Sequence, residues 1–280
     1  MIHSDAKYLT FKALHRPGQC FVMANAWDAG SARLLSSLGF AALATTSAGY
    51  AFSVGKRDSF AALSRDEILA NAAAIVAATD LPVSGDLEDG FGAAPDACFK
   101  TIEQAISVGL VGGSIEDATG DPAAPIHDLG HAVARVQAAV DAANGKPFLL
   151  TARAENYLWG RPDLSDTIAR LQAFSDAGAQ VLYAPGLPDL ETIRTVCAEV
   201  DKPVNVVMGL SGRAFTVAEL AEAGVCRISV GGSFARAALG AMMRAGREVL
   251  EQGTFTYADH AVSNDAVSGL MAQDQPFKTP

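Results

Sequence analysis

Residues 82–117 read PVSGDLEDGFGAAPDACFKTIEQAISVGLVGGSIED, which has the pattern of one strand–helix–strand unit. The short apolar runs Pro82–Asp86 and Gly112–Glu116 are typical of buried strands. Between them, Pro95–Val108 has apolar residues at spacings of three and four, and Gly109 follows as a helix stop. Strands joined through a helix pair in parallel, so this unit predicts a parallel sheet covered by helices.

The same alternation runs from about residue 20 to residue 252. The other strand-like runs are Phe21–Ala24, Ala41–Thr45, Pro147–Arg153, Val181–Ala184, Pro203–Val207 and Arg227–Val230. The other helix-like stretches are Ala29–Leu38, Ser64–Ala78, Leu129–Ala143, Leu164–Ala177, Leu190–Val200, Thr216–Ala223 and Ser233–Gln252. Eight such pairs predict an α/β fold of the TIM type, a (β/α)8 barrel, which commonly needs about 250 residues. A doubly wound open sheet is the alternative.

The chain divides into three parts. Residues 1–18 are expected to form an N-terminal helix that caps the barrel, and residues 19–252 are expected to form the barrel itself. Residues 253–280 are polar and poorly periodic. We expect this tail either to be disordered or to dock on a neighbouring subunit.

The composition is typical of a soluble globular protein with a sizeable core. Of 280 residues, 50% are hydrophobic and 19% are charged, and the formal net charge is −10. This acidic balance argues against a nucleic-acid partner, because phosphate binding needs a clustered basic surface. The four cysteines form no CxxC pair, the N-terminus lacks a signal-peptide pattern, and no apolar run approaches the roughly 18 residues of a membrane helix. We therefore expect a cytoplasmic protein with no membrane partner.

Acidic residues gather at the predicted C-terminal ends of neighbouring strands, where barrel enzymes place their active sites. Asp86 and Glu88 are two residues apart, so a strand would point both to one face, and Glu116 ends the next strand. Three converging carboxylates repel one another unless a cation lies among them. Oxygen ligands without His or Cys favour a hard ion, so the pattern predicts Mg²⁺, with Mn²⁺ as a substitute. The alternative is that these acids are solvated loop residues or partners of arginines.

Arg153 is the arginine at the predicted C-terminal end of a core strand. A guanidinium at this position suits a substrate carboxylate or an oxyanion that develops during a reaction. It can also pair with Glu116 or Glu155, and the two roles are compatible.

Other groups at the strand ends complete the candidate site. Hydroxyl, amide and backbone N–H groups suit a substrate carboxylate, and the residues that offer them are Thr46, Ser47, Ala48 and Asn205. The reaction also needs an acid or a base, for which the candidates are Asp58, Tyr50 and Glu155.

Six segments can be compared with a known family, namely Asn25–Arg33, Gly39-Phe40, Gly55–Asp58, Asp86–Gly92, Ser114–Asp117 and Thr151–Arg153. Together they resemble the isocitrate lyase/phosphoenolpyruvate mutase superfamily, from about residue 20 to residue 250. The resemblance implies Mg²⁺ on Asp86, Glu88 and Glu116, held partly through water. It implies a substrate carboxylate on Thr46–Ala48, with Asp58 and Arg153 beside the reacting group. It also implies that the last helix is exchanged between subunits of a homotetramer built as a dimer of dimers.

Members of this superfamily cleave C–C bonds, cleave or move C–P bonds, or decarboxylate oxaloacetate, and they share a metal-stabilised, enolate-like species. Isocitrate and methylisocitrate lyases carry a Lys-Lys-Cys-Gly-His loop, whereas residues 90–95 and 118–123 hold no Cys, Lys or His. The gating loop of the mutase is also missing. We expect a C–C lyase that acts on a small 2-oxo acid or 2-hydroxy diacid. A C–P mutase or hydrolase and an oxaloacetate decarboxylase are the alternatives.

Other classes fit the sequence less well. Lys146 and Lys202 precede strands, on the wrong side for a Schiff-base aldolase, and the five histidines form no zinc-binding set at strand ends. Glycines in residues 209–212 and 231–233 follow two strands, with Arg213 nearby, and suggest a phosphosugar enzyme. A non-catalytic 2-oxo acid binder that has lost its proton donor is the remaining alternative.

Overall fold

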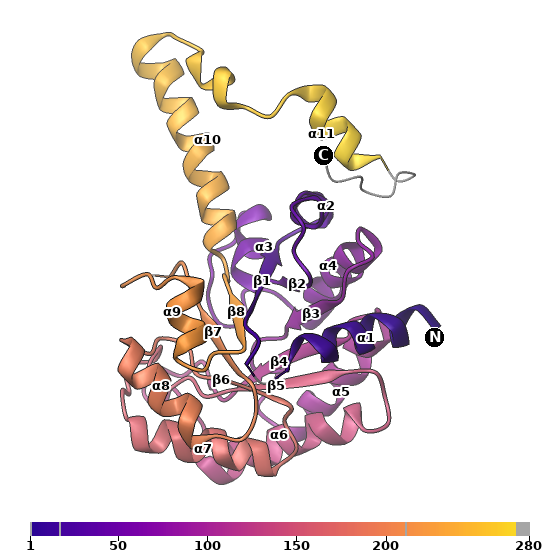
Figure 1. The fold of residues 1–280 in the computed structure, drawn as a ribbon, viewed down its shortest axis with the longest axis vertical. Helices are drawn as coiled ribbons and strands as arrows, with labels where there is room; N and C mark the ends of the chain where they lie inside the picture. Colours follow the sequence, from indigo (N-terminus) through magenta and orange to yellow (C-terminus); the bar gives the residue numbers. More distant parts are fainter. Residues whose placement is uncertain (1, 17, 211, 273–280) are drawn as a thin grey trace.

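The computed structural model of the chain describes residues 2–16, 18–210 and 212–272. Its strands run parallel and close into a barrel in which neighbours in sequence pair and β1 pairs with β8 (Figure 1). The strands are β1 Phe21–Ala26, β2 Leu43–Thr45, β3 Val83–Asp86, β4 Gly112–Glu116, β5 Leu149–Arg153, β6 Val181–Tyr183, β7 Val204–Val207 and β8 Arg227–Ser229. The predicted (β/α)8 barrel is confirmed, and the open sheet is excluded.

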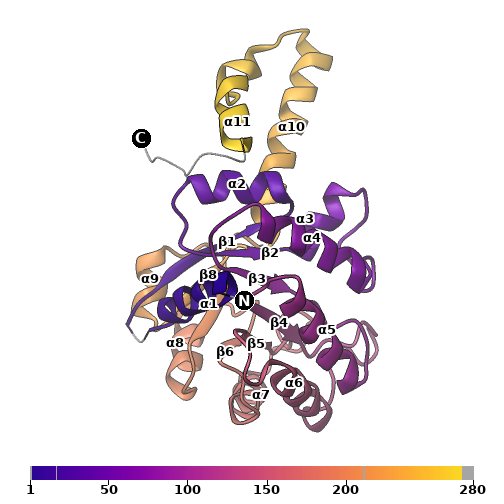
Figure 2. The ribbon, with the colours of Figure 1, turned by 90° about the vertical axis from the view of Figure 1, so that its right-hand side faces the viewer.

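Helices connect the strands and surround the barrel (Figures 1 and 2). The helices are α1 Ile2–Leu14, α2 Ala29–Ser37, α3 Ser47–Ser53, α4 Arg65–Ala77, α5 Pro95–Ser107, α6 Leu129–Ala143, α7 Leu164–Asp176, α8 Leu190–Glu199, α9 Val217–Glu222, α10 Ser233–Gln252 and α11 Asn264–Met271, with a 3₁₀ turn η1 at Thr256–His260. Each helix expected between strands is present. The sequence did not indicate α3 or α11.

Local sequence explains where several helices begin and end. Ser64 and Glu67 form a capping box at the start of α4, in which the Glu67 carboxylate accepts from the backbone N–H of Ser64 at 2.8 Å. Pro95 begins α5, where its missing N–H is not needed. Gly109 follows α5 with a φ of +93°, in the left-handed region that glycine tolerates. These signals keep the strand–helix units regular, so that the strand ends share one rim.

Helix α1 packs against the N-terminal end of the barrel. Its Phe11 side chain is fully buried and packs with Met23, Ala44 and Leu149. A Cβ atom on Gly112 would lie 2.8 Å from the Phe11 ring, so β4 needs glycine here for the helix to approach. The strand ends that carry the candidate acids face the opposite, C-terminal rim.

Helix α10 stands away from the barrel (Figures 1 and 2). Ala235, in its first turn, is buried, whereas Met242, Met243 and Leu250 are exposed by more than half. An exposed row of large apolar side chains is typical of a surface that another protein covers.

The chain returns toward the barrel after α10. Helix α11 contacts α2, and the Arg33 guanidinium donates to the backbone carbonyl of Ala272 at 3.4 Å. Helix α11 and Ala272, within the predicted tail, therefore pack on their own chain, and residues 273–280 lie outside the described residues.

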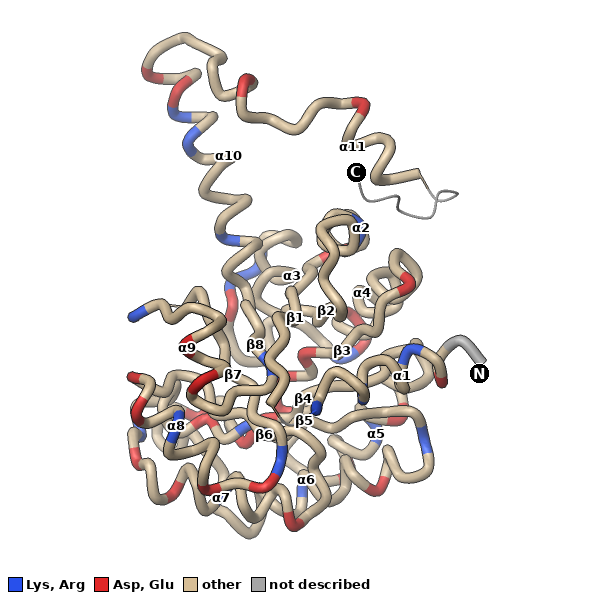
Figure 3. Tube along the Cα trace, in the orientation of Figure 1, with Lys and Arg blue, Asp and Glu red and all other residues tan. Residues whose placement is uncertain are grey.

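Charges are mixed along the chain. In Figure 3, Lys and Arg residues are interspersed with Asp and Glu residues over the outer helices and along α10. The absence of a nucleic-acid partner stays a prediction from the net charge. Within residues 2–16, 18–210 and 212–272, no helix is long and apolar enough to cross a membrane.

Candidate active site

A cavity of about 420 Å³ opens at the C-terminal rim and reaches down into the barrel. It contains most of the predicted site residues. Those that line it are Thr46, Ser47, Ala48, Asp58, Asp86, Glu88, Glu116, Arg153, Glu155 and Asn205. Residues from β2, β3, β4, β5 and β7 therefore meet in one space, as expected from parallel strands that end at one rim.

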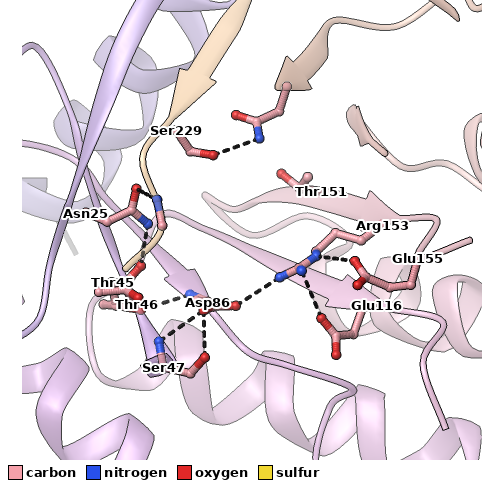
Figure 4. Close-up of polar contacts among 12 residues, drawn as sticks. Asn25, Thr45, Thr46, Ser47, Asp86, Glu116, Thr151, Arg153, Glu155 and Ser229 are labelled. Carbon is pink, nitrogen blue, oxygen red and sulfur yellow. Dashed lines mark hydrogen bonds and ion pairs between the residues drawn. The ribbon is translucent and has the colours of Figure 1, made fainter. Parts of the chain in front are cut away.

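Arg153 lies at the centre of the acidic rim (Figure 4). Its Nη1 donates to Asp86 Oδ1 at 3.2 Å, its Nη2 pairs with Glu116 Oε2 at 3.1 Å, and its Nε donates to Glu155 Oε1 at 2.9 Å. The guanidinium also lies over the Tyr183 ring, 5.0 Å from its centroid. One arginine thus holds three carboxylates, which fixes the end of β5 against β3 and β4.

Asp86 is held from its other side by the start of α3. The backbone N–H and the hydroxyl of Ser47 donate to Asp86 Oδ2 at 3.0 and 2.9 Å, and the Asp86 N–H donates to Thr45 Oγ1 at 2.8 Å. Thr46 is the N-cap of α3 and accepts from the N–H of Gly49. The Thr46–Ala48 segment was predicted to bind a substrate carboxylate; in this structure Ser47 positions Asp86.

Glu88 lines the cavity, but the reason differs from the strand alternation that the sequence suggested. Strand β3 ends at Asp86, and Glu88 has a φ of +48°, so strand alternation does not explain its direction. A left-handed conformation at a non-glycine residue costs on the order of 1–3 kcal/mol. Burial, followed by repulsion from Asp86 and Asp89, raises the pKa of Glu88 to about 8.

Arg135 of α6 holds the turn that contains Glu88. Its guanidinium is almost fully buried and donates to the backbone carbonyls of Asp89, Gly92 and Ala93. The Asp89 carboxylate accepts from the N–H groups of Phe91 and Gly92, at 2.9 and 3.3 Å. The strained turn is therefore kept in place by Arg135, by the Asp89 carboxylate and by the Glu88 carbonyl, which accepts from the N–H of Glu116 at 3.0 Å.

The remaining acids are also in unfavourable surroundings. Burial raises the pKa of Glu116 well above its usual value although Arg153 opposes the shift, and burial raises the pKa of Glu155. Asp58 lies on an exposed loop, where partial burial at the mouth and repulsion from Asp86 raise its pKa. A single arginine compensates this group of carboxylates only in part.

The fit of the rim to a divalent ion depends on its donor atoms and on its charge. Within the part of the chain that the structure describes, no three His, Cys, Asp or Glu side chains form a ready metal-binding group, and Arg153 holds Asp86 and Glu116. The donor set nevertheless consists of carboxylate oxygens, which Mg²⁺ prefers, and burial raises the pKa of Glu88 and of Glu116, a shift that a cation bound among them would oppose. The chemistry of these residues fits the predicted ion.

Two further predictions can be compared with the geometry. Asn205 lines the cavity, with its Oδ1 accepting from Arg227 Nε at 2.8 Å and its Nδ2 donating to Ser229 Oγ at 3.0 Å. Tyr50 packs against the core, and the described residues that line the cavity do not include it. The role of Tyr50 as an acid or base stays a prediction that the lining of the cavity does not support.

Sequence reasoning missed several residues of the cavity. These are Asn25, Leu158, Trp159, Tyr183, Arg227 and Ser229. Asn25 Nδ2 donates to the Thr45 carbonyl at 2.7 Å, and its Oδ1 accepts from the N–H groups of Val230 and Gly231 at 2.9 and 3.0 Å. A polar residue at the end of an apolar run was the available signal for Asn25, and an arginine within the run Arg227–Val230 was the signal for Arg227.

The glycines after β7 and β8 give the phosphosugar interpretation little support. Asn25 already occupies the N–H groups of Val230 and Gly231, which an anion at this loop would need. Gly209 has a φ of +83° and serves a turn, and Ser211, in the same segment, lies outside the described residues.

Comparison with known proteins adds to this geometry. A solved structure from Burkholderia cenocepacia J2315, provisionally assigned as a lyase/mutase, is 53% identical, covers 98% of each chain and has a TM-score of 0.94. An uncharacterized protein of Mycobacterium tuberculosis (strain ATCC 25618 / H37Rv) is 35% identical over 243 residues, which is 86% of this chain and 89% of the relative. The structure of a 2,3-dimethylmalate lyase, a member of the PEP mutase/isocitrate lyase superfamily, is 26% identical, covers 97% of this chain and 95% of its own, and has a TM-score of 0.85.

The family model for phosphoenolpyruvate phosphomutase matches residues 11–250, which includes every strand of the barrel and every acid of the rim. The resemblance noted in the sequence is thereby confirmed. The chain belongs to the phosphoenolpyruvate phosphomutase family of the isocitrate lyase/PEP mutase superfamily, whose members include lyases and mutases.

Proposed function

We propose that this protein is a Mg²⁺-dependent C–C lyase that acts on a small 2-oxo acid or 2-hydroxy diacid through an enolate-like intermediate. The observation that supports it is the rim itself, where Asp58, Asp86, Glu88, Glu116 and Glu155 line one cavity and Arg153 pairs with three of them. An excess of buried carboxylate is costly unless a cation compensates it. The similarity to a 2,3-dimethylmalate lyase supports the choice of a lyase.

Asp86, Glu88 and Glu116 are the residues that would hold the ion, with Mn²⁺ as a substitute for Mg²⁺. When bound, the ion would act as a Lewis acid toward the oxygen on C2 of the substrate. Ser47 keeps Asp86 in place, and Arg135 keeps the turn of Glu88 in place, so this chain orients two of the ligands before any ion arrives.

The other residues of the rim bind the substrate and move its proton. The Thr46–Ala48 segment would take the C1 carboxylate, and Arg153 would stabilise negative charge as it develops on oxygen. In the cleavage of a 2-hydroxy diacid, Asp58 takes the hydroxyl proton, the C2–C3 bond breaks, and C2 becomes a 2-oxo carbon. The electron pair of the broken bond stays with C3, whose fragment becomes an enolate, and Asp58 returns the proton to C3. The raised pKa of Asp58 suits both transfers.

The experiment is a panel of 2-oxo diacids and branched 2-hydroxy diacids incubated with MgCl₂, with release of a 2-oxo acid as the signal. We expect turnover that stops with a chelator and returns with added Mg²⁺. Release of CO₂ from oxaloacetate, or of phosphate from a phosphonate, would favour the decarboxylase or the C–P enzyme instead. Binding of 2-oxo acids without any turnover would favour the non-catalytic binder and contradict the proposed lyase.

We also propose that the protein forms a homo-oligomer through α10. The exposed side chains Met242, Met243 and Leu250 leave this helix without enough apolar contact on its own chain. Sedimentation should show a dimer or a tetramer, and Met242→Asp with Met243→Asp should shift it to the monomer. The matched control is Leu9→Asp on α1, because Leu9 is 63% exposed and α1 lies away from α10 (Figure 1). This variant should leave the assembly intact. A wild-type protein that sediments as a monomer would contradict this proposal.

A further inference from the structure

Arg227 lies at the floor of the same cavity, at the start of β8. It is 2% exposed, yet it lines the cavity. Its Nε donates to Asn205 Oδ1 at 2.8 Å, its Nη2 donates to Thr151 Oγ1 at 2.9 Å, and its Nη1 lies 3.3 Å from His15 Nε2. These contacts use three of the five N–H groups of the guanidinium and aim it into the barrel interior.

All three partners of Arg227 are neutral. His15 Nδ1 lies 2.9 Å from the carbonyl of Phe11, which can only accept, so Nδ1 carries the proton and Nε2 accepts from Arg227. Burial, and then the charge of Arg227, lowers the pKa of His15 to about 3, so the ring stays neutral. Throughout the described residues, no carboxylate forms an ion pair with Arg227.

A buried guanidinium without an anion is an unusual arrangement, because taking a charge out of water is costly unless it is paired. Burial lowers the pKa of Arg227 to about 10, which is the direction expected for a cation that lacks a counter-charge. An arginine that only filled the barrel could be replaced by an apolar side chain of similar volume. The positive charge at this point is therefore unexplained by packing.

The space beside Arg227 is small and polar. Ser84, Ser114 and Ser229 line the same cavity, and all three lie on strands of the barrel. Small side chains at these positions leave room above the guanidinium, and their hydroxyl groups can hydrogen-bond to an anion.

The floor and the rim lie at a fixed distance along β5. Arg227 contacts Thr151, and Arg153 is two residues further along the same strand, on the same face. Two residues of strand correspond to a rise of roughly 7 Å. In Figure 4, Thr151 lies between Ser229 and Arg153. A short, two-ended anion in the cavity can thus reach both guanidinium groups.

We propose that Arg227 binds the second carboxylate of a dicarboxylate ligand whose reacting end lies at the rim beside Arg153. This inference rests on the proposed function. It narrows the 2-oxo substrates to diacids and assigns the second carboxylate of any diacid substrate to a position deep in the barrel. Arg227 is then a specificity-determining residue. A monoacid leaves the positive charge of Arg227 unpaired, whereas the second carboxylate of a diacid forms an ion pair with it.

Matched ligands test the inference directly. Calorimetric titration in the presence of MgCl₂ would compare 2-oxoglutarate with 2-oxopentanoate, and oxaloacetate with 2-oxobutanoate, since the members of each pair differ in the second carboxylate. We expect the wild-type protein to prefer the diacid of at least one pair by about tenfold or more. Arg227→Gln should lose this preference while its affinity for the monoacid changes little, and Arg227→Lys should keep part of the preference.

Asn205→Asp is a second variant that keeps Arg227 in place. It puts a carboxylate against Arg227 Nε, where an amide oxygen now accepts at 2.8 Å, so the chain itself supplies the counter-charge. We expect this variant to unfold cooperatively and to lose the preference for the diacid. It decides the question if Arg227→Gln does not fold.

The outcomes separate the inference from the function on which it rests. Two results would overturn the role of Arg227 and leave the proposed function standing. One is equal binding of monoacid and diacid by the wild-type protein, and the other is a preference for the diacid that survives in Arg227→Gln and in Asn205→Asp. A wild-type protein that binds none of the four ligands would overturn both.

Discussion

Arg153 and Arg227 are two arginines that line one cavity, and the charges around them differ. Arg153 at the rim touches three carboxylates and leaves the acids around it short of positive charge. Arg227 at the floor touches a hydroxyl, an amide and a neutral imidazole. The same residue type therefore serves two purposes, because its counter-charges differ. We therefore propose a further cation at the rim and an anion at the floor.

The largest expected effect is at the rim, from Arg153→Gln. Its three carboxylates would lose their partner, and breaking a buried pair on one side costs about 3–5 kcal/mol of the free energy of unfolding. The loss of a charged donor at a developing oxyanion should also lower kcat by a factor of about 10² to 10³. Denaturant unfolding and the lyase assay measure the two effects. Arg161→Gln, an exposed arginine on the loop after β5, is the control, and equal losses in the two variants would contradict the role of Arg153.

A smaller effect is expected from Glu88→Gln, whose Tm relative to the wild-type protein should depend on whether Mg²⁺ is present. Without metal, removing one of the crowded carboxylates relieves repulsion, so Tm should stay the same or rise. With saturating Mg²⁺, the wild-type protein should gain stability that this variant largely lacks, because an ion that binds the folded state stabilises it. Thermal unfolding with and without Mg²⁺ checks both halves, and Asp96→Asn on α5 has the same change of charge at an exposed position. An identical gain from Mg²⁺ in Glu88→Gln would argue against Glu88 as a ligand.

The smallest effect is expected at the floor of the cavity, where His15 should make the free energy of unfolding depend on pH. The pKa of His15 is about 3 in the folded protein and about 6.5 when unfolded, so the unfolded chain takes up a proton first as the pH falls. Stability from His15 is therefore fully present above pH 6.5 and is lost as the pH drops from about 6.5 toward 3. Between pH 7 and pH 5 the wild-type protein should lose about 1–2 kcal/mol more than His15→Gln, in which the amide can still accept from Arg227. Parallel losses in the two proteins, measured by denaturant unfolding, would show that His15 is already charged in the fold.

The sequence predicted the barrel well because short apolar strands alternate with amphipathic helices, several of which end at a glycine such as Gly109 or Gly178. Strand β4 was predicted at its observed bounds, Gly112–Glu116. Helix α3 was missed because Ser47–Ser53 is too short to show a period, and its N-cap at Thr46 had been interpreted only as a binding segment. Helix α11 was missed because it gains its contacts from α2, which is far away in the sequence.

The candidate site was predictable where it depends on strand ends and less so elsewhere. Asp86, Glu116 and Arg153 each end a strand, so parallel pairing alone brings them together. Glu88 was placed in the cavity for the wrong reason, because its direction comes from a strained turn. Arg227 was missed because it begins its strand, and residues at that end of a barrel are ordinarily interpreted as structural.

The central claim, that the acidic rim binds a divalent cation, is tested most directly by titrating metal-free protein with Mn²⁺ and following the loss of the free-ion electron paramagnetic resonance signal. We expect one site per chain that Mg²⁺ displaces, and we expect Asp86→Asn to lose it while Asp96→Asn keeps it. Absence of a site in the wild-type protein, or equal binding by both variants, would contradict the claim.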